Sequence, residues 1–413
     1  MKKLLFIPIF MFGVNFSDIQ NDITNSLIYK ISQKKIEIYK QKLKIMKSKN
    51  YGSLDLKYDA IHMFNQPYSY IHTIQGTTTA YLSDKNHFIG EIKYSYPIFS
   101  GFAISNMINK SKLELIKEQL NLKNTKRVLL LEVSEIYGNI YAIKKNIEAL
   151  KSAKKSLYIS KEKAISFYNS GLLDKSKVEE IKAKYYEVLA DIKNLENQKN
   201  SLLDTLSYIL NKKISKIDGI KIEKITSPSF DKRVDVKVLK QTLKIANKEI
   251  KIAKAENYPT IGIEVGLKKE ADNLGLNENK YQNINKSYIA LELNYNIFSG
   301  GETKAKIELA KLAKDNAILI YNNYLNKIKT EYDNDLNNFE ALKYQLKAAK
   351  KEILARKEYY DYIQAKFNEG LVDSSDLNDA ITKLSQSKAK KDSIKAKLFI
   401  LSIKLKLNGG NDE

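Results

Sequence analysis

The chain has 413 residues, a formal net charge of +22, no Cys and only three His. The absence of cysteine excludes disulfides, thiolate metal sites and cysteine nucleophiles, and three histidines leave little for a zinc site or a histidine general base. The basic excess would suit nucleic acid, but Lys is interleaved with Glu, Asp and Asn along the whole chain, which favours solvated helix faces. Since no phosphate-binding, zinc-protease or serine-hydrolase motif occurs either, we expect a protein that is not an enzyme and binds no cofactor and no metal.

The N-terminus has the pattern of a secretory signal peptide. Lys2 and Lys3 precede the apolar run 4–14, and polar sequence follows. The run is too short to span a bilayer as a helix, so we predict a signal peptide over residues 1–17 and an exported mature protein, with a buried N-terminal helix as the alternative. No later segment has the length and apolar character of a transmembrane helix, so any membrane crossing is expected to use β-strands.

A first structural repeat is predicted over residues 18–210. Its expected elements are a helix, two strands, a long helix and a shorter helix, at 18–49, 51–62, 87–97, 102–168 and 174–210. The strands alternate apolar residues with charged or small ones, and both later helices carry apolar residues at the heptad spacing of a coiled coil. Gly171 suits the left-handed turn between those two helices.

An equatorial linker, 211–232, leads to a second repeat, 233–407, and a short tail, 408–413. The second repeat has the same expected elements in the same order, at 233–257, 259–268, 287–297, 302–368 and 373–407. Gly370 takes the place of Gly171 in the turn between its last two helices.

Two pairs of matching segments indicate that the repeats arose by duplication. Residues 94–101 (YSYPIFSG) match 293–300 (LNYNIFSG), and residues 168–174 (YNSGLLD) match 367–373 (FNEGLVD), both at an offset of 199. One offset shared by two separate matches means that the sequence between them was copied without insertion or deletion.

The four predicted strands each have one apolar and one charged face, and long polar loops, 63–86 and 268–286, separate the strands of each pair. This alternation is typical of a transmembrane barrel, although a soluble antiparallel sheet shows the same pattern strand by strand. Four strands cannot close a barrel, and an open edge cannot exist in lipid. We therefore expect oligomers, and three copies would supply twelve strands.

Tyrosines flank the predicted strands. Tyr51, Tyr96, Tyr258 and Tyr295 lie where strands meet helices. Because tyrosine is enriched where a membrane meets water, these four residues predict an interfacial belt; ordinary core packing is the alternative.

The sequence resembles the TolC-like outer-membrane efflux protein (OEP) family over about residues 18–408. The resemblance rests on the paired strand–long-helix repeats, the YPIFSG and YNIFSGG segments, the NYPT strand start and the FNEGL turn. It implies a mainly α fold with transmembrane β: a homotrimer whose 12-stranded β-barrel in the outer membrane is continuous with an α-helical barrel tunnel in the periplasm.

The resemblance also implies a function and partners. The function is that of a passive duct from periplasm to exterior in a tripartite efflux pump or a type I secretion system. The implied partners are a periplasmic adaptor (membrane fusion) protein, an inner-membrane RND or ABC transporter and outer-membrane lipid, with no nucleic acid.

A periplasmic gate just after the helix turns is a further implication of the resemblance. Counted from Gly370, the family's luminal aspartate rings fall on Asp376 and Asp379, its latching aromatic falls on Phe367, and the matching acidic position of the first repeat is Lys177. Phe367 lacks the hydroxyl of the family's tyrosine at that position.

Capping is the competing interpretation for the acidic residues near the turns. Asp174 and Asp373 each stand where a helix begins, and an Asp there accepts hydrogen bonds from backbone N–H groups. We expect Asp373 to act as a cap and Asp376 to act as cap, lumen residue or both. Asp379 lies beyond the cap, so we expect it in the lumen or in solvent.

Two functions of other classes remain open from the sequence. One is a structural or adhesive surface coiled-coil protein without a pore, in which the strands form a soluble cap. The other is a basic cytosolic coiled coil that binds nucleic acid, which the signal-like start and the alternating strands disfavour.

Overall fold

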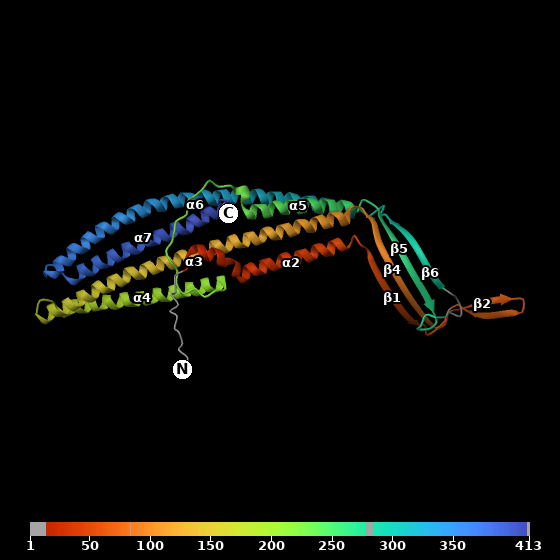
Figure 1. The fold of residues 1–413 in the computed structure, drawn as a ribbon, viewed down its shortest axis with the longest axis horizontal. Helices are drawn as coiled ribbons and strands as arrows, with labels where there is room; N and C mark the ends of the chain where they lie inside the picture. Colours follow the sequence, from red (N-terminus) through yellow and green to blue (C-terminus); the bar gives the residue numbers. More distant parts are fainter. Residues whose placement is uncertain (1–13, 83, 278–283, 411–413) are drawn as a thin grey trace, which may run out of the picture. The chain divides into compact units, whose positions relative to one another are not determined.

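The structure is a computed structural model that describes residues 14–82, 84–277 and 284–410. It is mainly helical, with long helices and an antiparallel sheet, as expected from the sequence (Figure 1). Most of the predicted signal peptide and the last residues of the predicted tail lie outside the described residues. The chain forms two compact units: unit 1 comprises residues 1–35, 119–239 and 321–413, and unit 2 comprises residues 36–118 and 240–320.

The helices of the described residues are α1 (Phe16–Asp22), η1 (Ile23–Asn25), α2 (Leu27–Ser48), α3 (Ala103–Asn169), α4 (Lys175–Leu210), η2 (Phe230–Lys232), α5 (Val234–Ala255), α6 (Glu302–Asn368) and α7 (Ser374–Asn408). Among the described residues, none of these helices combines the length and the apolar character needed to span a bilayer.

Unit 1 is built on two helical hairpins, α3–α4 and α6–α7 (Figure 1). Heptad positions of these helices form its core, because the apolar seam of each coiled-coil helix is buried against its neighbours. Near the turns this core contains Leu157, Val178, Ile181, Ile363, Leu377 and Ile381. Further along, Tyr137 and Phe399 are fully buried, and the ring of Phe16 lies 5.5 Å and 5.1 Å from theirs.

The start of the described chain differs from expectation. The predicted single helix 18–49 is divided into α1, η1 and α2, since Ile19 and Ile23 turn into the core and Ser26 interrupts the helix. The predicted end of the signal peptide at residue 17 falls inside α1, and Val14 pairs with Ile217 of the linker in an isolated β-bridge. Residues 14–17 are thus part of the packed unit.

Unit 2 contains the four-stranded antiparallel sheet, in the order β1-β4-β5-β6. Its strands are β1 (Ser53–His62), β4 (Asn86–Ser100), β5 (Thr260–Ala271) and β6 (Ile284–Asn294). Leu54, Leu56, Ile289, Leu291 and Leu293 are exposed apolar side chains of the two edge strands, β1 and β6. Because side chains alternate along a strand, the charged residues between them lie on the opposite face of the sheet.

One predicted loop is wrong. Residues 63–86 do not form a long polar loop, because they contain a second antiparallel pair, β2 (Tyr68–Thr73) and β3 (Gly76–Tyr81). The β-branched and aromatic residues of this segment favour strands, and Gly76, with a φ of +124°, supplies the tight turn between them.

Candidate functional site

The two helix turns of unit 1 share one backbone design. Gly171 and Gly370 have φ values of +72° and +75°, and a Cβ on either would meet no atom within 4 Å. The left-handed backbone, rather than lack of space, therefore requires glycine. After each glycine the next amide closes the helix end: Leu172 N donates to Phe167 O at 2.9 Å, and Leu371 N donates to Lys366 O at 2.9 Å.

Asp373 caps α7, as expected. Its Oδ1 accepts hydrogen bonds from the backbone N–H groups of Ser375 (2.8 Å) and Asp376 (3.2 Å). Partial burial acts to raise the pKa of Asp373, but the ion pair with Lys177 and these two amides outweigh it and hold the pKa below its usual value. Asp174 occupies the equivalent position before α4 but accepts no capping hydrogen bond, so the two turns are not equivalent.

Polar contacts join the two helical hairpins at their turns. Lys177 Nζ of α4 lies 3.1 Å from an Asp373 carboxylate oxygen. Lys163 Nζ of α3 donates to both the backbone carbonyl (3.0 Å) and the side-chain oxygen (2.9 Å) of Asn368 at the end of α6. Sequence reasoning placed Lys177 near the gate but missed the Lys163–Asn368 contact, which joins residues 205 positions apart.

Phe367 lies in the interior of unit 1. Its side chain is only 2% exposed, and its ring centroid is 6.2 Å from that of Phe167, the residue of the other hairpin that precedes the matching turn. Phe367 thus packs the two hairpins together through apolar contact, and it has no hydroxyl with which to form a polar latch.

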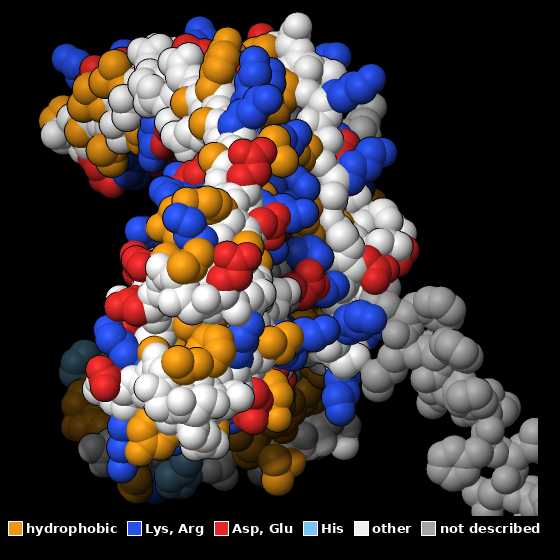
Figure 2. All heavy atoms as spheres, turned by 90° about the vertical axis from the view of Figure 1, so that its left-hand side faces the viewer, with side chains coloured by type: hydrophobic (Ala, Val, Ile, Leu, Met, Phe, Trp, Pro, Cys, Tyr) orange, Lys and Arg blue, Asp and Glu red, His pale blue; other side chains and the backbone are white. Residues whose placement is uncertain are grey.

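Asp376 and Asp379 both lie on the exposed side of α7, opposite the buried Leu377 and Ala380. The Asp379 side chain is 66% exposed and accepts a hydrogen bond from Lys383 at 2.9 Å, one turn along the same helix. Figure 2 faces the end of the molecule that carries the turns and shows acidic and basic side chains interspersed with apolar ones.

The sheet of unit 2 carries a polar network on its charged face. Tyr288 of β6 donates from its hydroxyl to Glu264 (2.7 Å) and Glu91 (3.1 Å), and Lys93 pairs with Glu264 at 3.1 Å. The Tyr288 ring lies over its cross-strand partner Gly266, where a Cβ would come within 2.4 Å of the ring. Sequence reasoning did not single out Tyr288.

The four flanking tyrosines, Tyr51, Tyr96, Tyr258 and Tyr295, are all exposed, from 38% to 73%. All lie at the end of the sheet where strands lead to helices. The four side chains are thus not part of a core within the single chain, and the interfacial belt stays a prediction.

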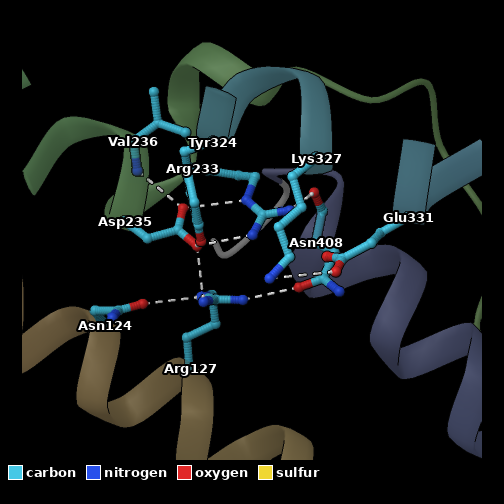
Figure 3. Close-up of polar contacts among 9 residues, drawn as sticks. All are labelled: Asn124, Arg127, Arg233, Asp235, Val236, Tyr324, Lys327, Glu331 and Asn408. Carbon is cyan, nitrogen blue, oxygen red and sulfur yellow. Dashed lines mark hydrogen bonds and ion pairs between the residues drawn. The ribbon is translucent and has the colours of Figure 1, made fainter. Parts of the chain in front are cut away.

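A buried charge cluster in unit 1 was not predicted (Figure 3). Arg233 donates to both carboxylate oxygens of Asp235, at 3.1 Å and 2.7 Å, and Arg127 of α3 donates to the same carboxylate at 2.8 Å. The hydroxyl of Tyr324 of α6 donates to Asp235 at 2.7 Å, and both arginines also donate to Asn408 at the end of α7. The cluster therefore ties α3, α5, α6 and α7 together.

Opposite effects act on the charge of Asp235. Burial acts to raise its pKa, but the hydrogen bonds and charges of Arg233 and Arg127, with the Tyr324 hydroxyl, lower the pKa below its usual value. Burial, followed by the hydrogen bond to Asp235, raises the pKa of Tyr324. The negative charge of Asp235 therefore offsets the free-energy cost of burying the guanidinium groups of Arg127 and Arg233.

The chain has recognisable relatives among solved structures. It superposes on the outer membrane channel CmeC from Campylobacter jejuni with a TM-score of 0.80, at 16% identity, covering 96% of this chain and 86% of that one. For VceC from Vibrio cholerae the TM-score is 0.76 at 14% identity, and the match covers 96% of each chain. For CusC the TM-score is 0.81 at 14% identity, and the match covers 95% of this chain and 91% of that one. No curated protein sequence matches the chain.

These likenesses establish the fold. In the sequence itself, residues 229–406 match the family described as outer membrane efflux protein. This match covers α5, the second pair of strands of the sheet, α6 and most of α7. Residues 229–406 are therefore similar in sequence to the outer membrane efflux protein family, and the chain as a whole shares the fold of outer-membrane channels.

Proposed function

We propose that three copies of this chain form a passive duct from the periplasm to the exterior, as the outer-membrane part of a tripartite efflux pump or a type I secretion system. In this assembly twelve strands close a barrel that is continuous with an α-helical tunnel. The proposal includes the two repeats, 18–210 and 233–407, an N-terminal signal peptide, and luminal roles for Asp376 and Asp379.

The observation that carries the proposal is found at the two edges of unit 2. The edge strands β1 and β6 each have an unpaired side. β1 follows α2 directly, and β6 leads directly into α6. Within unit 2, α2 exposes Ile38 and Ile45, and α6 exposes Leu312 and Leu319, each pair at heptad spacing. The segment formed by α2 and β1 thus has an unpaired strand edge and an exposed apolar stripe, and so does the segment formed by β6 and α6.

A neighbouring copy meets both needs at once. If β1 of one copy pairs with β6 of the next, α2 of the first copy comes beside α6 of its neighbour, and the two stripes cover each other. Such a head-to-tail contact closes into a ring. Two copies would give eight strands, the minimum for an outer-membrane barrel, and three copies give twelve; the likeness to TolC-like channels favours three.

The partner inferred for the other end is a periplasmic adaptor, which links the duct to an inner-membrane RND or ABC transporter. Near the turns of unit 1, a groove of 440 Å³ runs between α3, α4 and α7. Its floor is apolar, with Leu157, Val188 and Ile381, and its rim carries Lys184 and Glu187. An apolar floor with charges of both signs on the rim suits an amphipathic helix of a partner.

The test is the assembly state in detergent. Purified protein is expected to have the mass of a trimer and to form ion-conducting pores in a planar bilayer. A protein that stays monomeric in detergent and lipid, or trimers that never conduct, would contradict the proposal and favour the surface coiled coil.

A further inference from the structure

The β2–β3 hairpin of unit 2 extends the β1–β4 pair beyond the four-stranded sheet (Figure 1). Met63 N donates to Lys85 O at 2.7 Å and Leu82 N donates to Pro67 O at 2.9 Å, so the pair continues from the sheet into the hairpin. No side chain of β2 or β3 is buried. A two-stranded hairpin without a packing partner is at best marginally stable in water, so this hairpin needs a surface to cover it.

The composition of the hairpin is unlike that of the rest of the chain. Residues 60–83 contain no Asp, Glu, Lys or Arg, whereas the chain average of 29% charged residues would put about seven in a stretch of this length. Tyr70, Ile71 and Ile74 are exposed apolar or aromatic side chains. Neither strand carries the lysine or proline with which natural proteins protect an exposed edge.

We infer that the partner of this hairpin is a second copy of itself: the three hairpins of the proposed trimer converge beyond the outer end of the barrel and pack on one another. The inference rests on the trimer proposed above. The helices leave the sheet at the end marked by Tyr51 and Tyr258, and the hairpin leaves it at the opposite end, so the hairpins lie on the exterior side.

Charge is the reason why a copy of the same segment is the favoured occupant. Identical segments that meet on a threefold axis bring identical charges together, which costs free energy unless the segment has none. A chain with a net charge of +22 repels its own copies over most of its surface. Residues 60–83 carry no Asp, Glu, Lys or Arg, so copies of this segment do not repel one another. A charged partner would gain nothing from a surface without charge.

The dimensions allow the contact. Twelve strands spaced about 4.8 Å apart and tilted by about 40° give a barrel with a radius of roughly 12 Å. A hairpin with six residues in each strand is roughly 20 Å long. The hairpin is longer than the radius, so tips that lean inward reach the axis. Ile74 is the exposed apolar residue of the turn at the tip.

The experiment uses the full-length trimer and the absence of native cysteine. In the Ile74→Cys variant, mild oxidation is expected to join two copies of one trimer, at least about tenfold faster than in the Lys57→Cys variant. Lys57 is an exposed residue on the charged face of β1. Copies there lie roughly 20 Å apart across the barrel, beyond the reach of a disulfide of about 7 Å between Cα atoms. Native mass measurement after oxidation shows whether the linked copies belong to one trimer.

A second substitution tests the physical reason. Thr78→Lys in the Ile74→Cys background places three like charges between the hairpins and is expected to remove the rapid cross-linking, whereas Thr78→Ser should retain it. Three outcomes would each overturn the inference and leave the trimer intact. The trimer forms but Ile74→Cys cross-links no faster than the control, or the linkage joins only separate trimers. The third outcome is that lipid vesicles alone protect the cysteine from labelling. Loss of the trimer itself would instead contradict the proposed function.

Discussion

Lys177 Nζ lies 3.1 Å from an Asp373 carboxylate oxygen, which joins the first helix turn of unit 1 to the cap of the second. The same carboxylate group accepts hydrogen bonds from two backbone amides of α7. Asp373 therefore caps the N-terminus of α7 and connects α7 to the other hairpin.

The contribution of this carboxylate can be tested by substitution. Asp373→Ala removes the cap, which is worth about 1 kcal/mol, together with the exposed ion pair to Lys177, and is expected to lower the thermal unfolding midpoint measured by circular dichroism. Asp174→Ala is the matched control, because Asp174 stands at the equivalent position and caps nothing. Equal losses in both variants would show that neither the hydrogen bonds nor the ion pair of Asp373 stabilises α7.

Asp235 should be far more costly to replace. In Asp235→Asn, the two buried guanidinium groups lose their counter-charge, and we expect a loss of about 3–5 kcal/mol in the free energy of unfolding of unit 1. Asp204→Asn, on an exposed position of α4, is the control and should change stability little. A small effect in chemical denaturation of Asp235→Asn would mean that water or a shifted side chain replaces the carboxylate.

The same carboxylate predicts a pH dependence. Because its folded pKa lies below the unfolded value of about 3.9, the unfolded chain binds the proton more readily. The stabilisation is therefore fully present above about pH 5 and is lost as the pH falls through the folded pKa. Unfolding midpoints measured from pH 7 down to pH 3 should fall more steeply for the wild type than for Asp235→Asn. Parallel curves would contradict this assignment.

The extent to which the sequence predicted these features follows from the range of the interactions. Local patterns indicated a long helix at 102–168, and α3 spans Ala103–Asn169; they also indicated a cap at Asp373. The contact of Arg127 with Asp235 joins residues 108 positions apart, and no local pattern reports such a contact. The β2–β3 pair was missed because an uncharged segment has no alternation of apolar and charged residues from which to recognise a strand.

The two faces of β6 should respond differently to charge. Leu291→Arg and Leu293→Arg put a cation on the apolar face, which costs about 2–4 kcal/mol at the middle of a bilayer, and trimer yield in outer-membrane extracts should fall. Glu292→Arg changes the opposite face and should assemble normally. If all three variants assemble equally well, the apolar face of the sheet does not contact lipid.

The final prediction concerns Asp376 and Asp379 in the proposed trimer, where they place six carboxylates near the narrow end of the tunnel. Like charges held close together, with little bulk water between them, create a negative potential that attracts cations. Wild-type channels in a planar bilayer should thus be cation-selective and be blocked by trivalent cations added from the periplasmic side.

Replacing both aspartates with Asn preserves side-chain size and removes the charge, so the double variant should lose most of the block and still form trimers. Lys177→Ala provides an independent check, because it frees the Asp373 carboxylate from its ion pair and so adds negative charge beside the ring. That variant should be blocked more strongly than the wild type. An Asn double variant that is blocked as well as the wild type would show that Asp376 and Asp379 are ordinary solvated residues of α7, and that the trivalent cation binds elsewhere in the channel.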